Sequence, residues 1–216
     1  MKLNFTQAEK QRVQLTTKQQ KQIQKLYQNA AKEVARQAKK APKTASDILR
    51  KQYLEQLGKQ LNKELNRIGL ELNSTIRANM ETMAEAVVKD NLSFLKEINL
   101  YVKSDFSHVP DDIVRAVASG QLYEGNWSLS RAIWKNVRKT QKDIQEVIAQ
   151  GIAQNKSAYD IAKDLEKYVD PLAKKDWDWS KVYPGTAKKV DYNAQRLART
   201  MVSHAYQQSF VRTTQK

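Results

Sequence analysis

The sequence predicts an all-α protein, with a long antiparallel helical hairpin resembling a coiled-coil rod, followed by a compact helical bundle. Gly and Pro number only six and four in 216 residues, whereas straight-chain residues that lose little side-chain freedom in helices are abundant. Apolar residues recur every three or four positions over long stretches, and the alternation typical of strands is nearly absent. We expect two domains, an elongated basic hairpin over 1–105 and a helical bundle over 106–216.

The first helix is expected to begin at Thr6 and to run to about Lys40. Glu9 lies three positions after Thr6, as in a capping box, and Phe5 is placed to act as a hydrophobic staple. The apolar positions of the first half are weak, as at Val13, and the stronger ones come later, at Ile23, Tyr27, Ala30 and Val34. The first half therefore either depends on a partner or frays.

The second expected helix carries the strongest pattern in the chain. Pro42 breaks the first helix, and Ser46 can cap a new one that runs to about Asn99. Ten apolar residues follow with an average step of about 3.67, which keeps their stripe nearly straight: Leu54, Leu57, Leu61, Leu65, Ile68, Leu72, Ile76, Met80, Met83 and Val87. So long a helix needs a partner along it, either the first helix folded back or another copy. Gly58 and Gly69 are candidate points of close contact.

Shorter capped helices are expected after residue 106. Pro110 suits the first turn of a helix that Gly120 closes. Ser128 or Ser130 caps the next helix, whose apolar face contains Ile133, Val137, Ile144, Ile148 and Ile152. Ser157 caps a further helix, which ends at Asp170 and Pro171.

The last part of the chain is expected to be an irregular loop followed by one helix. The loop contains Trp177 and Trp179, which either anchor it to the bundle, the interpretation we favour, or serve as anchors for a protein partner. Trp127 and Trp134 lie seven positions apart and are interpreted as packing between helices. The final helix starts near Lys188 and shows no stop signal, so we expect the natural chain to continue.

Both ends of the chain are basic. Residues 1–60 hold 14 Lys and Arg against 4 Asp and Glu, residues 61–170 hold 15 against 16, and residues 171–216 hold 9 against 3. Such ends favour a polyanion, either a phosphate backbone or an acidic protein surface. The alternative is that the lysines only keep a helical surface soluble.

Three clusters of basic residues are candidates for contact with a polyanion. No base-reading motif accompanies them, so any contact with DNA should be independent of sequence. One cluster, on a single expected helix, is Lys135, Arg138, Lys139 and Lys142. A second cluster combines Lys188 and Lys189 with Arg196 and Arg199. The candidate nucleic-acid-binding residues are Lys39, Lys40, Lys43, Arg50 and Lys51 around the first break, and Lys188 and Lys189 at the expected start of the last helix.

Catalytic and metal chemistry has no support in the sequence. Ser203 and His204 are adjacent, so on a helix they point about 100° apart and cannot form a nucleophile–base pair. The chain has no cysteine, and Asp176 and Asp178 lack the further oxygens of a calcium loop. The six glycines form no phosphate-binding loop. We expect no enzyme activity, no cofactor and no metal.

A membrane role is not expected either. The amino-terminal stretch becomes polar before the apolar region of a signal peptide could form. No segment approaches the roughly 20 apolar residues that a spanning helix requires.

Residues of about 145–212 resemble the phage Mu F-like head morphogenesis proteins, which are minor head or minor capsid proteins of tailed phages. The resemblance is carried by "GIAQNKSAYDIAKDLEKYV", a basic loop and "RLARTMVSHAYQQSF". Met201 stands where many members have Glu, and a later segment of the family with Cys, His and Asp is missing. The residues that match the family motifs, interpreted as structural, are Ile161, Ala162, Leu165, Arg196, Ala198, Arg199 and Thr200.

The resemblance implies a virion component in the capsid interior, assembled in the bacterial cytoplasm. The partners implied are the portal protein, packaged DNA without sequence preference and further copies of the chain. The role implied is in head assembly and in DNA packaging or ejection. Within the motif, Arg199 and Thr200 are expected to bridge helices or cap a turn. Two alternatives remain open: a sequence-independent DNA-binding helical protein, and the non-catalytic amino-terminal part of a larger enzyme or toxin.

Overall fold

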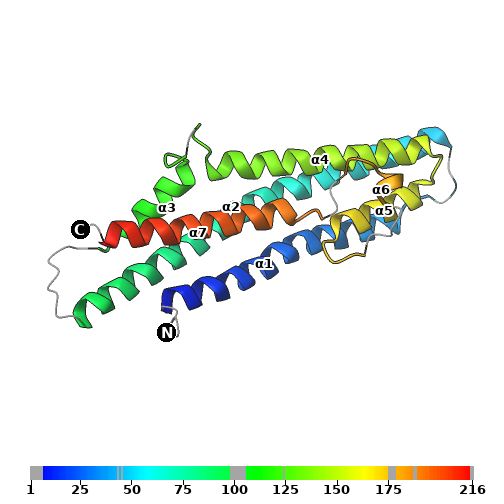
Figure 1. The fold of residues 1–216 in the computed structure, drawn as a ribbon. Coiled ribbons are helices and arrows are strands. Elements are labelled where there is room, and N and C mark those ends of the chain that lie inside the picture. The colour runs from blue at the N-terminus through cyan, green and yellow to red at the C-terminus, as the bar shows by residue number, and fades with distance from the viewer. Residues whose placement is uncertain are drawn as a thin grey trace. The chain divides into compact units, whose positions relative to one another are not determined.

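The computed structural model describes residues 7–42, 44, 46–97, 106–123, 125–174, 179–186 and 189–214. Every regular element in these ranges is a helix, and no strand occurs in them (Figure 1). The predicted all-α fold class is confirmed. Thr6 and Phe5, the expected cap and staple of the first helix, lie outside the described residues.

Helix α1 (Gln7–Ala38) is anchored by its second half. The four predicted core residues there, Ile23, Tyr27, Ala30 and Val34, are all buried. In the first half Val13 is 63% exposed, and the buried residues are Ala8 and Gln19. The amide of Gln19 has no hydrogen-bond partner among the residues described. Burial of an unpaired amide costs free energy. The first half therefore buries fewer apolar side chains than the second half, and its fraying or dependence on a partner stays a prediction.

Helix α2 (Asp47–Glu97) is a single helix of 51 residues. Ser46 caps it, since its hydroxyl accepts a hydrogen bond from the Leu49 N–H at 3.4 Å and its carbonyl one from the Arg50 N–H at 2.9 Å. All ten residues of the predicted stripe are at most 3% exposed. The period of the sequence thus identifies the buried face of α2 from Leu54 to Val87.

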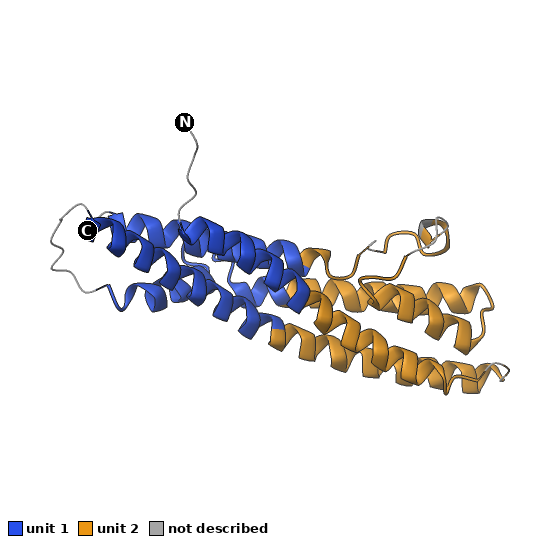
Figure 2. Cartoon of the chain, turned by 90° about the horizontal axis from the view of Figure 1, so that it is seen from below, with its two compact units in different colours: residues 1–22, 72–133, 194–216 blue, residues 23–71, 134–193 orange. Residues whose placement is uncertain are grey.

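The chain forms two compact units, each of which combines segments from before and after residue 105 (Figure 2). Unit 1 comprises residues 1–22, 72–133 and 194–216, and unit 2 comprises residues 23–71 and 134–193. This division differs from the two consecutive domains expected over 1–105 and 106–216. The physical reason is that helices from the second half of the sequence cover the apolar face of α2.

In unit 2, α2 packs between α1 and α4 (Leu129–Ala153). Gln60 donates to Glu33 at 2.6 Å and the Tyr53 hydroxyl to the Gln37 carbonyl at 2.7 Å, so the two helices run antiparallel. On α4, Trp134 and Val137 approach Gly69, while Gln145 and Ile148 approach Gly58. A Cβ added at Gly69 would lie 3.1 Å from Val137 Cγ2. Both glycines are therefore points of close helix contact, as predicted.

In unit 1, α2 is contacted by α1 and by α7 (Tyr192–Thr214). Asp90 accepts a hydrogen bond from the Ala8 N–H at 3.4 Å, and Asn79 donates to Gln22 at 3.4 Å, so α1 is again antiparallel to α2. The Asn91 amide donates to the Thr213 hydroxyl of α7. Small buried residues on α7 permit close packing: Ala194, Ala198, Ala205 and Ser209.

The shorter helices begin and end at the predicted caps. Helix α3 (Val109–Ser119) has Pro110 in its first turn and ends at Gly120, whose φ of 85° is the left-handed conformation. Ser128, and not Ser130, caps α4 by accepting the Arg131 N–H at 3.2 Å. Helix α5 (Ala158–Val169) is capped by the Ser157 hydroxyl.

Two details of the later segments differ from expectation. The loop expected to be irregular contains one helical turn, α6 (Trp179–Val182), and α7 begins at Tyr192 rather than near Lys188. Trp127 is 39% exposed and lies under the Arg131 guanidinium, 5.5 Å from the ring centroid. Because Trp127 precedes α4, it does not share a helix face with Trp134, and its predicted role in the core is wrong.

Candidate nucleic-acid interface

The first basic cluster lies at the turn between α1 and α2, in unit 2. Lys39, Lys40 and Lys51 are exposed, and Lys43 lies outside the described residues. The Lys40 N–H donates to the Gln37 carbonyl at 2.9 Å as α1 ends. Lysines in this position also interact favourably with the carboxyl-terminal end of the helix dipole. Three of the predicted side chains are therefore available to solvent here.

Arg50 belongs to this cluster in sequence but has a different role. Its Nη1 donates to the carbonyl of Lys156 at 3.4 Å, and its Nη2 pairs with the Asp47 carboxylate at 3.2 Å. The side chain is only 18% exposed. Arg50 thus joins the first turn of α2 to the connection between α4 and α5, and this structural contact competes with any role in binding phosphate.

The most continuous basic surface lies on α4. Lys135, Arg138, Lys139 and Lys142 are all exposed, and their spacing of three, four and seven places them on one face of the helix. Among the described residues, Arg138, Lys139 and Lys142 form no ion pair. Unit 2 as a whole holds 23 Lys and Arg against 14 Asp and Glu, a formal charge of +9. We call these four residues the α4 basic stripe.

The third cluster is divided between the units. Lys189 is exposed and belongs to unit 2, whereas Arg196 and Arg199 are exposed residues of α7 in unit 1. Lys188 lies outside the described residues. The structure therefore does not assign these side chains to one surface.

The residues that carry the family resemblance divide into buried and exposed sets. Ile161, Ala162, Leu165 and Ala198 are fully buried. A Cβ added at Gly151 of α4 would lie 2.7 Å from Ile161 Cγ1, so α5 packs very closely on α4. The buried set is a helix-packing signature.

The exposed part of the motif corrects one expectation. Arg196, Arg199 and Thr200 are exposed on α7, and Thr200 donates to the Arg196 carbonyl one turn earlier at 3.0 Å. Such a bond stays within one helix. Because Ala198 faces the core, the next position points about 100° away from it. Bridging of helices or capping of a turn by Arg199 and Thr200 is therefore not observed.

His204 is held by a tyrosine. Its Nδ1 forms a hydrogen bond with the Tyr123 hydroxyl, and the two ring centroids lie 5.1 Å apart. Burial lowers the pKa of His204 and so favours its neutral form. In the part of the chain that the structure covers, no group of three or more His, Asp or Glu side chains could hold a metal ion.

Unit 2 also contains a tyrosine–aspartate network that sequence reasoning missed. Tyr168 donates to Asp143 at 2.7 Å, Tyr183 donates to Asp164, and Lys156 Nζ lies 2.7 Å from the same Asp164. The ring of Trp179 stacks on Tyr168 with centroids 6.2 Å apart. Trp179 therefore anchors the loop, as we favoured, and Trp177 lies outside the described residues. The partners are far apart in sequence, so no local pattern could have indicated them.

Comparisons with known proteins do not assign a family to the chain. No family model, no curated protein and no solved structure matches it. None of the described helices is both long enough and apolar enough to cross a bilayer.

Proposed function

We propose that the chain is a phage minor head protein that associates with the portal or procapsid and with packaged DNA, supporting head assembly and DNA packaging or ejection. The observation that carries the proposal is the pair of motifs over 145–212, "SAYDIAKDL" and "RLARTM". The proposal places the protein in the capsid interior after assembly in the bacterial cytoplasm, and it assigns the chain no catalytic step and no cofactor.

The α4 basic stripe supports contact with packaged DNA. Each Lys or Arg that approaches a phosphate releases a condensed counterion, and this gain does not depend on base sequence. A protein inside a head meets DNA of every sequence, so a contact of this kind suffices. The exposed lysines Lys39, Lys40 and Lys51, at and after the α1–α2 turn, add positive charge to the same unit.

A second candidate is a sequence-independent DNA-binding helical protein without a role in the capsid. The unpaired charges of Arg138, Lys139 and Lys142 favour it equally. The two candidates differ in one respect: the head-protein proposal requires binding to portal, whereas a simple DNA-binding protein does not bind portal.

The test immobilises purified portal protein of the phage that encodes this sequence, and measures both portal retention and DNA affinity. The variant Arg138→Gln, Lys139→Gln, Lys142→Gln is expected to keep portal retention at low salt. The slope of log affinity for duplex DNA against log salt should fall by about 2.7 in magnitude, since each lost phosphate contact removes about 0.9.

Three exposed lysines of α1 provide the matched control, Lys10→Gln, Lys18→Gln, Lys21→Gln, which removes the same charge from unit 1. Its salt slope should change much less than that of the α4 variant. Failure of portal to retain the unmodified protein at low salt would rule out the head-protein proposal. Equal loss of DNA affinity in the two variants would show that the α4 basic stripe is not the DNA-binding surface.

A further inference from the structure

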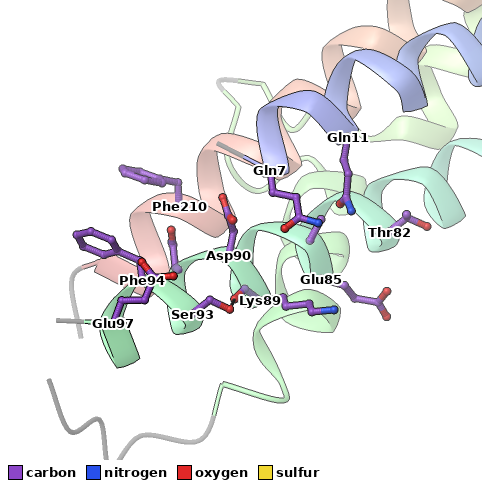
Figure 3. Close-up of a pocket in the computed structure, with 12 residues that line it drawn as sticks. Gln7, Gln11, Thr82, Glu85, Lys89, Asp90, Ser93, Phe94, Glu97 and Phe210 are labelled. Carbon is purple, nitrogen blue, oxygen red and sulfur yellow. Dashed lines mark hydrogen bonds between the residues drawn. The ribbon is translucent and has the colours of Figure 1, made fainter. Parts of the chain in front are cut away.

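Unit 1 contains a groove that neither the DNA surface nor the family motifs account for. It has a volume of about 750 Å³ and lies between the first turns of α1, the last turns of α2 and the end of α7 (Figure 3). Cavities of this size accommodate ligands or side chains of a partner. We call it the α1–α2–α7 groove.

One face of α2 forms most of its wall. The lining residues from α2 extend from Thr82 to Glu97 and include direct neighbours such as Asp90 and Asn91, so the wall is broader than one row of side chains. Fifteen residues of helix rise about 22 Å, or roughly four turns. A groove of that length is long enough for a helix of a partner to lie in it.

Two aromatic side chains lie at one end of the groove. Phe94 of α2 is 59% exposed and Phe210 of α7 is 48% exposed. Figure 3 shows both rings at the same end of the groove, one from each helix. Large aromatic side chains are costly to leave in water, and neighbouring exposed aromatics are typical of sites where a partner inserts an apolar side chain.

The charge of the groove is opposite to that of the protein. Glu85, Asp90 and Glu97 line it together with a single lysine, Lys89, in a chain of formal charge +15. Asp90 accepts the Ala8 N–H at the start of α1, whereas Glu85 and Glu97 are exposed. These carboxylates repel a phosphate backbone and attract basic side chains.

We propose that the α1–α2–α7 groove binds a basic amphipathic helix of another protein, which inserts an aromatic or long aliphatic side chain beside Phe94 and Phe210 and pairs Lys or Arg with Glu85 and Glu97. A second copy of this chain fits less well, because two chains of charge +15 repel each other. The proposal assigns a partner to a surface that the DNA contact does not use, and it does not depend on the head-protein function.

The experiment uses a fluorescein-labelled 15-residue peptide with Phe and Leu at helical spacing and Lys elsewhere, and a second peptide in which every Lys is Glu. The 216-residue chain is expected to bind the Lys peptide and not the Glu peptide in fluorescence anisotropy. Phe94→Ser and the pair Glu85→Lys, Glu97→Lys should each weaken binding by about tenfold or more, because each removes one of the two contacts that the proposal assigns to the partner.

Matched controls come from the exposed surface of α2 in unit 2, namely Leu70→Ser and Glu55→Lys, which should bind as the unmodified protein does. Circular dichroism establishes that each variant is folded. Equal binding of both peptides, or unchanged binding by both groove variants, would overturn the proposal. So would self-association in analytical ultracentrifugation that Phe94→Ser abolishes, because the occupant would then be a second copy.

Discussion

Replacing Leu65 by alanine is expected to lower the free energy of unfolding by about 2–5 kcal/mol, the range found when a buried leucine is truncated in a packed core. Leu65 lies in the middle of the α2 stripe and is 1% exposed. The loss combines the transfer free energy of the removed carbons with the cavity that they leave. Chemical denaturation followed by ellipticity at 222 nm measures it.

Leu70 provides the control on the same helix, five residues away. Its side chain is 64% exposed, so Leu70→Ala should change the stability by no more than about 0.5 kcal/mol. Similar losses for Leu65→Ala and Leu70→Ala would mean that the buried face of α2 has been assigned incorrectly.

Raising the pH above 10 is expected to unfold the protein, because unit 2 buries Tyr27, Tyr168 and Tyr183. Burial is the main cause of the raised pKa of each hydroxyl, and Asp191, Asp143 and Asp164 respectively raise it further. The folded-state pKa values therefore exceed the value of about 10 in the unfolded chain. Stability is fully present below pH 10 and is lost as the pH rises, because only the unfolded chain releases these protons.

The free energy of unfolding is expected to fall by about 1.4 kcal/mol per pH unit for each tyrosine. For the three tyrosines together the fall is about 4 kcal/mol per pH unit. Absorbance at 295 nm reports tyrosine ionisation, and ellipticity at 222 nm reports helix. The three buried tyrosines should ionise only as the helices are lost. Ionisation of Tyr27, Tyr168 and Tyr183 near pH 10 in a protein that keeps its helical ellipticity would contradict this account.

Local features of the fold were predictable because their causes are local. The 3.67-residue period of α2 records which face is buried, and all ten residues of its stripe are buried. Ser157, Gly120 and Pro110 act at the helix ends where their backbone preferences place them. Each of these signals lies within a few residues of the structure that it specifies.

The partners of α2 could not be predicted, because a periodic stripe shows which face is covered but not by what. The sequence predicts cover by the first helix folded back or by another copy, whereas the structure adds α4 in unit 2 and α7 in unit 1. The contact of Arg50 with the Lys156 carbonyl depends on the same non-local packing.

The candidate sites show the same limit. The composition locates the basic stretches of the chain. Only the structure distinguishes Arg50, whose guanidinium already pairs with Asp47, from the exposed side chains of the α4 basic stripe. The α1–α2–α7 groove has no signature in the sequence, since Phe94 and Phe210 lie over a hundred residues apart and neither interrupts a helical pattern.

The central claim is that helices from both halves of the chain lie against α2, and cysteine cross-linking tests it most directly because the native chain has no cysteine. Asn66 and Gln141 form a hydrogen bond of 3.2 Å in unit 2, and Asn91 and Thr213 form one in unit 1. The account predicts that Asn66→Cys with Gln141→Cys, and Asn91→Cys with Thr213→Cys, are each joined within one chain by a short bifunctional maleimide.

The control pair is Glu55→Cys with Gln141→Cys. It should not be joined, because Glu55 lies eleven residues before Asn66 on α2, a distance of about 16 Å along the helix. Absence of a cross-link from both test pairs in folded protein would contradict the account.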